Sequence, residues 1–287
     1  MRLLRQSGDS RPTPDIRTRT LLVGLGAPKA GTSWLWTYLA GHRNFFASPV
    51  KELDVFNRWY PDPFRAQAPD VRQRRIEDII RKGPRALFGR NRRTLRALSD
   101  LGHVRNADDY RGFFADRIGN EPVFGDITPS YALLSRQALQ DIATITDDVR
   151  FLFIMRDPAD RTVSDIRHQR RRNSPDESID DIIKGLARRD RLYQRSNYPR
   201  TLDALAGLEH RTLLLIYEDL FRDETARHIC SWLGLDYVPP DAGRRVNAAR
   251  TEDLSDAQKA TVREILSPVY RDLGARLGSS KPAQWRW

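Results

Sequence analysis

The sequence predicts an α/β fold, in which a central parallel sheet of about five strands is flanked by helices. Four short apolar runs lack the strict alternation of half-buried strands, as expected for strands buried on both faces of a parallel sheet. Stretches with helical spacing lie between these runs, and such a repeated order of strand and helix is typical of α/β layer folds. The expected strands are residues 21–25, 123–127, 151–155 and 213–217, with residues 45–47 as a fifth.

We expect one domain over residues 20–287. The chain has 287 residues, of which 39% are hydrophobic and 30% charged, and no linker or repeat divides it. Residues 1–19 contain several arginines and two prolines but no continuous apolar stretch, which indicates a flexible lead-in rather than a signal peptide or anchor. The longest apolar runs fall far short of the roughly 20 residues that a membrane helix needs. Together with a single cysteine, Cys230, these features favour a cytoplasmic protein without a membrane span.

The charge balance is basic. Lys and Arg number 49 against 38 Asp and Glu, a formal net charge of +11. Such an excess suits nucleic acid, an anionic membrane surface or an anionic small molecule, and composition does not choose among them. Residues 70–105 hold eleven of these cations, which predicts a basic helical insertion, either solvated or forming a wall beside an acidic substrate. The five histidines and the cysteine are scattered, so we expect no metal site.

A glycine-rich turn follows the first expected strand. Residues 24–33 read GLGAPKAGTS, and helical spacing of apolar residues begins directly afterwards. This order of strand, turn and helix aims backbone N–H groups and a helix N-terminus at an anion. Gly31 allows a phosphate to approach closely, and Thr32 and Ser33 supply hydroxyl donors.

The turn differs from the nucleoside-triphosphatase pattern G-x-x-x-x-G-K-[ST]. Gly26 and Gly31 have the required spacing, but Thr32 stands where that pattern has lysine, and the lysine lies inside the loop as Lys29. Asp157 does not resemble a magnesium ligand, because Pro158 after it predicts a helix N-cap. The loop therefore predicts phosphate binding without the usual metal.

A second anion site is expected at the end of the strand 151–155. Arg156 ends this strand, and the next helix carries Arg161, Ser164 and His168 on one face at spacings of three and four. Arginine and serine together suit a phosphate group. Ligands of open α/β sheets bind at the carboxyl ends of the strands, so both anion sites should lie at one edge and hold two phosphates of one ligand.

The C-terminal region predicts a covering helix. Ser255 and Gln258 have the spacing of a capping box, which marks a helix start. Pro268 is expected to kink or split this helix. Helical spacing follows the cap at Val262, Ile265, Leu266, Val269 and Leu273.

Several of these segments resemble the sulfotransferases that use 3′-phosphoadenosine 5′-phosphosulfate (PAPS). Residues 26–35 resemble their 5′-phosphosulfate loop, residues 156–164 their 3′-phosphate site, and residues 217–220 (YEDL) a segment that follows a late strand. Lys51-Glu52 after the second expected strand is similar to the K-E pair of the carbohydrate (heparan-sulfate-like) and bacterial branch. The resemblance covers roughly residues 20–275.

The resemblance implies a P-loop-type α/β domain that transfers a sulfuryl group from PAPS to a hydroxyl or amine. The acceptor would be a glycan or small molecule, the product nucleotide adenosine 3′,5′-bisphosphate, and no metal would take part. Lys29 would stabilise the leaving phosphate oxygen, since positioned cations and dipoles stabilise developing charge. The other residues expected to bind the donor are Ala30, Gly31, Thr32, Ser33, Arg156 and Ser164, with Trp34 either stacked on adenine or packed on a helix face.

On the acceptor side, the resemblance implies that Glu52 is the general base. Lys51 would either lower the energetic cost of the negative charge beside Glu52 or contact the sulfate. His168 would approach the transferred group, or it is only an exposed helical residue. Asp126 ends the strand 123–127 and is expected to bind substrate, to assist Glu52 or to cap a helix.

Two other functions remain open. A nucleotide or small-molecule kinase with a divergent phosphate loop would share the first anion site, although the displaced lysine speaks against it. A nucleic-acid-binding protein would suit the charge and the basic run 167–172, but no aromatic-rich binding motif accompanies them, so we expect no nucleic-acid partner. Many relatives carry a later R-K-G or K-G-R loop over the 3′-phosphate, and residues 243–245 (GRR) are no clear match.

Overall fold

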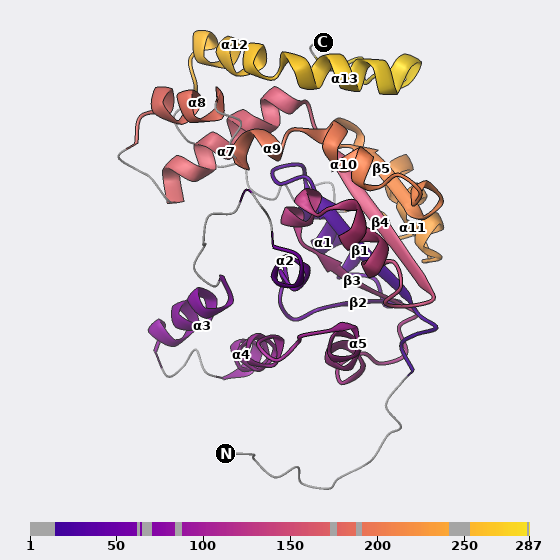
Figure 1. Ribbon diagram of the computed structural model, residues 1–287. Helices are drawn as coiled ribbons and strands as arrows, with labels where there is room; N and C mark the ends of the chain where they lie inside the picture. Colours follow the sequence, from indigo (N-terminus) through magenta and orange to yellow (C-terminus); the bar gives the residue numbers. More distant parts are fainter. Residues whose placement is uncertain are drawn as a thin grey trace, which may run out of the picture.

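A single five-stranded parallel sheet forms the centre of the computed structural model (Figure 1). The structure describes residues 15–61, 64, 71–83, 88–172, 177–187, 191–240, 253–285 and 287. The strand order is β2-β3-β1-β4-β5, and every neighbouring pair is parallel. All five predicted strands are confirmed, each with ends within three residues of the expected ones. They are β1 (Thr20–Gly26), β2 (Phe45–Ala47), β3 (Val123–Ile127), β4 (Asp148–Met155) and β5 (Thr212–Ile216).

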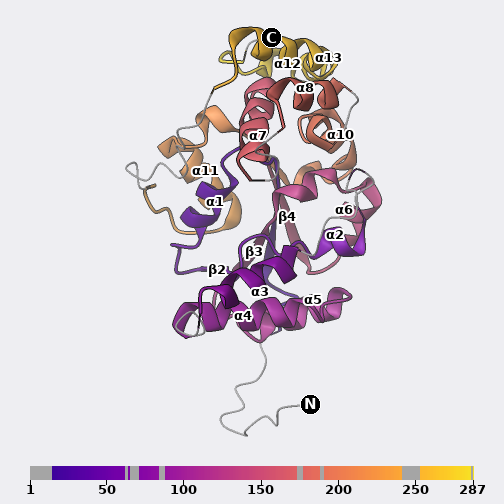
Figure 2. The same cartoon turned by 90° about the vertical axis from the view of Figure 1, so that its left-hand side faces the viewer.

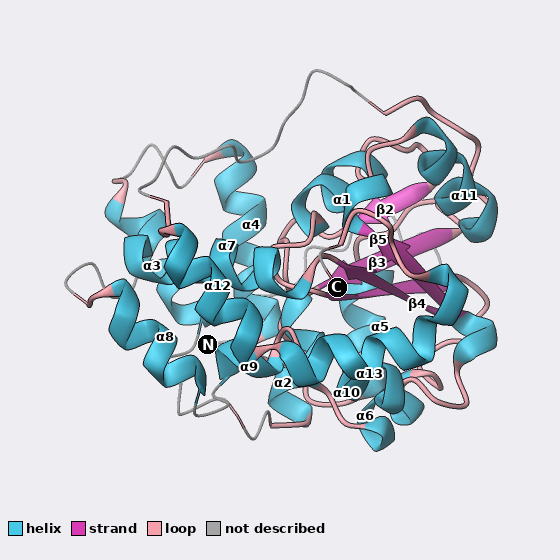
Figure 3. Cartoon of the chain, turned by 90° about the horizontal axis from the view of Figure 1, so that it is seen from above, coloured by secondary structure: helices cyan, strands magenta, loops and turns pink. Residues whose placement is uncertain are grey.

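Helices surround this sheet, as the view from above shows (Figure 3). In Figures 1 and 2, α3, α4 and α5 lie together next to β2 and β3, and α7, α8, α12 and α13 lie together at the opposite end of the molecule. The bounds are α1 (Thr32–Leu39), α2 (Phe56–Trp59), α3 (Val71–Arg81), α4 (Gly89–Leu101), α5 (Ala107–Ala115), α6 (Arg136–Ile142), α7 (Pro158–Arg172), α8 (Ile179–Ala187), α9 (Arg191–Gln194), α10 (Tyr198–Ala204), α11 (Asp223–Leu233), α12 (Asp256–Ile265) and α13 (Ser267–Leu277).

The burial of the strands follows their place in the sheet. All residues of β3, and all of β1 except Thr20, are buried, as the continuous apolar runs predict. Gly125 interrupts the run in β3 because a Cβ there would lie 2.6 Å from the ring of Phe45. β5 departs from the prediction: it is an edge strand, its burial alternates, and Leu214 is exposed.

The C-terminal prediction is confirmed in detail. Ser255 and Gln258 form the capping box of α12, and Pro268 stands in the first turn of α13, so the expected helix is split in two. Both halves cover the domain, with α12 packed on α7 and α8 and α13 packed on α10.

The basic insertion and the chain start also pack on the domain. Residues 70–105 include α3 and α4, and Ala97, Leu98 and Leu101 of α4 are buried. Of the expected lead-in, residues 1–14 lie outside the described residues, whereas Ile16 is buried and Arg19 donates hydrogen bonds to the carbonyl oxygens of residues 119 and 121. No helix in the described part of the chain is long and apolar enough to cross a membrane.

Candidate functional site

The loop between β1 and α1 presents backbone N–H groups at the carboxyl edge of the sheet. Gly31 precedes α1 with a φ of 82°, and among the described residues no side chain caps the helix there. The first N–H groups of a helix have no partner within it, so this N-terminus offers donors to an anion. Thr32, which opens the helix, is buried, and Ser33 is half-buried.

The backbone of this loop needs its glycines. Gly26 has a φ of 128°, and a Cβ added there would lie 2.6 Å from the carbonyl oxygen of Pro129. Lys29 also takes a positive φ, 69°, which is unfavourable for a residue with a side chain. Such conformations persist where the surroundings hold them and are common at functional sites.

The two predicted anion sites lie side by side. β1 and β4 are hydrogen-bonded neighbours, and the Ala27 N–H donates to the carbonyl oxygen of Ile154 at 2.9 Å. Arg156, just after β4, donates from Nη1 to the carbonyl oxygen of Lys29 at 3.2 Å. Lys29 and Arg156 therefore lie at one edge of the sheet, as the sequence predicts.

The segment after β5 holds Arg156 in place. The guanidinium group lies over the ring of Tyr217, 4.6 Å from its centroid. Glu218 accepts a hydrogen bond from the Asp157 N–H at 3.3 Å, and Asp157 in turn caps α7 by accepting from the N–H groups of Ala159 and Asp160. The N-cap prediction for Asp157 is thus confirmed. The segment 217–220 holds Arg156 through the ring of Tyr217 and holds the next residue, Asp157, through Glu218.

The electrostatic environment of Lys29 favours an anionic partner. Burial lowers the pKa of Lys29, and the charges of Arg171, Arg161 and Arg156 lower it further, against an opposing effect of Asp165. Positive charge thus gathers around a partly buried lysine, and Asp165 offsets it only in part, which is costly unless a further anion is present.

Arg161 is not a phosphate ligand, although its helical spacing placed it with Ser164. Its side chain is completely buried and donates to Asp165 at 2.9 Å, Ser196 at 2.5 Å and the carbonyl oxygen of Leu192 at 3.0 Å. Burial raises the pKa of the Asp165 carboxyl, but Arg195 and Arg161 outweigh that effect and hold it well below its usual range. This cluster fixes α7 behind the anion sites.

Two further residues of α7, Ser164 and His168, were predicted to take part in the site. Ser164 and His168 are both half-buried, and Arg171 donates to His168 Nδ1 at 3.4 Å. The expected second 3′-phosphate loop, residues 243–245, lies outside the described residues.

Trp34 belongs to the packing of α1. Its ring stacks on Tyr38, with centroids 5.2 Å apart and an interplanar angle of 2°, and meets the edge of Phe221. The side chain is nearly buried. Of the two predicted roles, the structure favours packing on a helix face over stacking on adenine.

Lys51 and Glu52 lie in a turn after β2. Lys51 Nζ and Glu52 Oε1 are 2.6 Å apart, and Arg75 Nη2 lies 3.7 Å from Glu52 Oε2. Glu52 has a φ of 62° and Asp54 a φ of 57°, so this turn, like the Lys29 loop, contains residues in the left-handed region. The Glu52 side chain is 38% exposed and therefore accessible to solvent.

Asp126 is a buried support for this turn. Its carboxylate accepts hydrogen bonds from the hydroxyls of Thr128 and Tyr131, both at 2.7 Å, and from the Leu53 N–H. Burial raises its pKa to about 6, partly offset by those hydrogen bonds. The residue is 1% exposed, so it does not face an acceptor. It holds the backbone next to Glu52 through Leu53, and its assistance to Glu52 stays a prediction.

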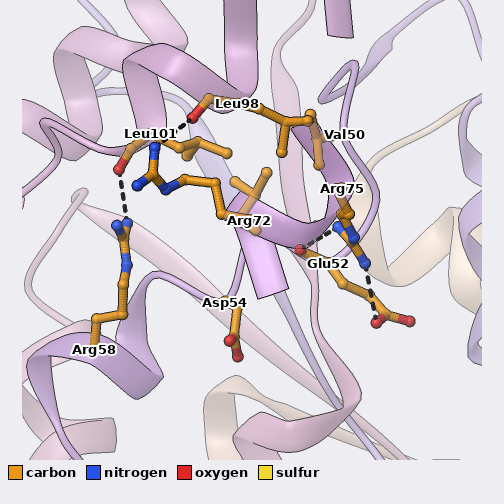
Figure 4. A pocket seen from close by; sticks show the side chains of 9 residues that line it. Val50, Glu52, Asp54, Arg58, Arg72, Arg75, Leu98 and Leu101 are labelled. Carbon is orange, nitrogen blue, oxygen red and sulfur yellow. Dashed lines mark hydrogen bonds and ion pairs between the residues drawn. The ribbon is translucent and has the colours of Figure 1, made fainter. Parts of the chain in front are cut away.

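A small pocket opens beside the turn. Figure 4 shows Glu52 and Asp54 on one side of it and side chains of the basic insertion on the other. The insertion therefore borders the candidate site. The side chains that α2, α3 and α4 contribute are Arg58, Arg72, Arg75, Leu98 and Leu101.

Three residues of this site were not found from the sequence. Arg75, Tyr217 and Glu218 reach the site through contacts with residues 23 to 61 positions away, so no local spacing reveals them. Tyr217 and Glu218 were noted only as part of a resembling segment. Within the described residues, no group of three or more His, Cys, Asp or Glu side chains is placed to hold a metal ion.

Solved structures share this fold. The sulfotransferase from Alicyclobacillus acidocaldarius is 19% identical with a TM-score of 0.64, and the comparison covers 94% of this chain and 96% of the other. The sulfotransferase domain of the Synechococcus PCC 7002 olefin synthase is 18% identical with a TM-score of 0.52, covering 93% and 98%. The sulfotransferase domain from the curacin biosynthetic pathway is 16% identical with a TM-score of 0.51, covering 88% and 96%. No curated protein sequence matches this chain.

A family model described as the sulfotransferase family matches residues 22–239. This span begins in β1 and includes the Lys29 loop, the turn at Glu52 and Arg156. The chain therefore belongs to the sulfotransferase family and is an enzyme of that class.

Proposed function

We propose that this sulfotransferase takes its sulfuryl group from PAPS and transfers it to a hydroxyl or amine of a glycan or small-molecule acceptor, with Glu52 as the general base. The observation that carries the proposal is the contact between Arg156 and the Lys29 carbonyl oxygen, which joins two cationic sites at neighbouring strand ends. PAPS and its product adenosine 3′,5′-bisphosphate carry two separate anionic groups on one adenosine, which matches two adjacent anion sites.

The residues at these sites fit such a donor. The N-terminus of α1 has donors without a side-chain cap among the described residues, and they suit a 5′-phosphate. Arg156 Nε is buried and has no hydrogen-bond partner in the described part of the chain. A buried donor left unpaired is costly, so a 3′-phosphate on Arg156 and Ser164 would satisfy it.

The residues of the loop after β1 would each act on the bound donor. When bound, PAPS supplies a sulfuryl group attached to a phosphate that can leave. The Lys29 ammonium stabilises negative charge on the leaving oxygen, and the backbone N–H groups and hydroxyls of Thr32 and Ser33 hold the 5′-phosphate. These donors are fixed by the fold before the reaction, so little reorganisation is needed when charge develops.

The acceptor would enter from the side of β2 and β3. The donor sites use the ends of β1 and β4, and the turn with Glu52 follows β2 at the same edge of the sheet. Glu52 would remove the acceptor proton, and Lys51, 2.6 Å from its carboxylate, would hold that side chain or contact the sulfate. His168 on α7 is proposed to approach the transferred group from the donor side.

Nucleotide preference tests the two anion sites. Adenosine 3′,5′-bisphosphate should raise the melting temperature, because a ligand that binds only the folded state stabilises it, by about 2.7 kcal/mol at 100 times its Kd. AMP, which lacks the 3′-phosphate, should give a much smaller shift at equal concentration. Differential scanning fluorimetry measures both. A larger shift with ATP and magnesium would favour a kinase, and one with a short DNA duplex a nucleic-acid-binding protein.

The pH dependence of nucleotide binding tests Lys29. Because burial and neighbouring arginines lower the pKa of Lys29, its ammonium loses a proton at lower pH than an ordinary lysine with a pKa of about 10.4. The affinity for adenosine 3′,5′-bisphosphate should therefore fall as the pH rises toward that value, measured by titration calorimetry between about pH 7 and pH 10. Lys29→Arg should abolish the fall, since arginine stays protonated. An affinity that is constant to pH 10 in the wild type would contradict the assignment.

Glu52→Gln tests the general base. The substitution keeps the size of the side chain but removes its basicity, so sulfuryl transfer should fall by roughly 10²- to 10⁴-fold. The affinity for adenosine 3′,5′-bisphosphate should stay within about twofold. The assay uses radiolabelled donor with acceptors from a screen of glycans, alcohols and amines, and Glu77→Gln on the exposed face of α3 is the matched control. Retained turnover in Glu52→Gln would remove Glu52 from this role.

A further inference from the structure

We infer that Arg75, from the basic helical insertion, is a positioning residue for Glu52 and holds the turn that carries it. The inference rests on the proposed role of Glu52 as the base. It assigns the insertion a function in the reaction, beyond that of a solvated helical surface.

The turn needs external support. Glu52 and Asp54 both have positive φ values, 62° and 57°, in a region that residues with side chains avoid. Backbone in this region persists only where the surrounding structure fixes it. The direction of the Glu52 side chain therefore depends on the groups that hold residues 51–54.

One set of contacts holds the turn from the sheet. The Leu53 N–H donates to the carboxylate of Asp126, and the Asp54 N–H donates to Thr128 Oγ1 at 3.4 Å. Both contacts use backbone N–H groups after Glu52. They do not engage the carbonyl oxygens of Lys51 and Glu52.

Arg75 engages those two carbonyl oxygens. Its Nη1 donates to the oxygen of Lys51 at 2.7 Å. The same Nη1 donates to the oxygen of Glu52 at 3.1 Å, and Nη2 lies 3.7 Å from Glu52 Oε2, as Figure 4 shows. A single guanidinium group therefore contacts both the backbone and the side chain of the candidate base. A lysine cannot reproduce this arrangement, because its ammonium lacks the planar fork of donors.

The helix that carries Arg75 is itself anchored. Ile76 and Ile79 of α3 pack against the hydrophobic core, and Arg72 donates to the carbonyl oxygen of Leu98 in α4 at 3.5 Å. Arg75 is half-buried between this helix and the turn, whereas its neighbour Arg74 is exposed. The insertion thus provides a fixed position from which one of its many arginines reaches the site.

Loss of this contact should slow the reaction without weakening the donor site. A reacting group misplaced by about 1 Å costs roughly 100-fold in rate. We expect Arg75→Ala to lower kcat by roughly 10- to 100-fold while leaving the KM for PAPS and the affinity for adenosine 3′,5′-bisphosphate within about twofold. Arg75→Lys should recover only part of the rate, and Arg74→Ala, the matched control, should behave as the wild type.

A double substitution separates positioning from a general structural effect. If Arg75 acts through Glu52, adding Arg75→Ala to Glu52→Gln should lower kcat no further, since residues that act as a unit are not additive. Effects that multiply, or a kcat within twofold of the wild type in Arg75→Ala, would overturn the inference. If Arg75→Ala does not fold, the same comparison is made with Arg75→Lys. Full activity of Glu52→Gln would instead refute the assignment of the base, so the two failures are distinguishable.

Discussion

The pairing of β1 with β4 is the constraint on which the rest of the site depends. Parallel neighbours end at the same edge of a sheet, so the loop after β1 and the residue after β4 must meet. This brings Lys29 and Arg156 together although they are 127 positions apart in the sequence. Ligand binding at the carboxyl ends of strands is general in open α/β sheets, and here two cationic residues lie side by side at that edge.

Cations that lie close together in a partly buried space need neighbouring groups that hold them and offset their charge. The buried cluster of Arg161, Asp165 and Arg195 supplies it, because Asp165 lies 2.9 and 3.0 Å from the two guanidinium groups and stays ionised. Tyr217 also packs against the guanidinium group of Arg156, and Glu218 accepts a hydrogen bond from the Asp157 N–H. The structure therefore separates cations that stabilise the fold from those that face the site, a division that charge alone does not reveal.

Local sequence signals predicted most of the fold and the position of the glycine-rich loop within it. The apolar runs predicted the strands. The capping box and Pro268 predicted the C-terminal helices, and the glycine-rich turn predicted the loop between β1 and α1. The same reasoning misplaced Arg161, because its spacing on α7 says nothing of Ser196 and Leu192, which bury it. Arg75 had no local signal either, since its two carbonyl partners lie 24 and 23 positions away. Local sequence patterns therefore did not reveal the contacts between segments that are far apart in the sequence.

The most direct test of the account is a crystal structure of the protein with adenosine 3′,5′-bisphosphate. The account predicts the 5′-phosphate within hydrogen-bond distance of Lys29 and the backbone N–H groups of residues 31–33, and the 3′-phosphate on Arg156 and Ser164. A nucleotide that contacts only one of these two groups, or that binds away from the ends of β1 and β4, would contradict it.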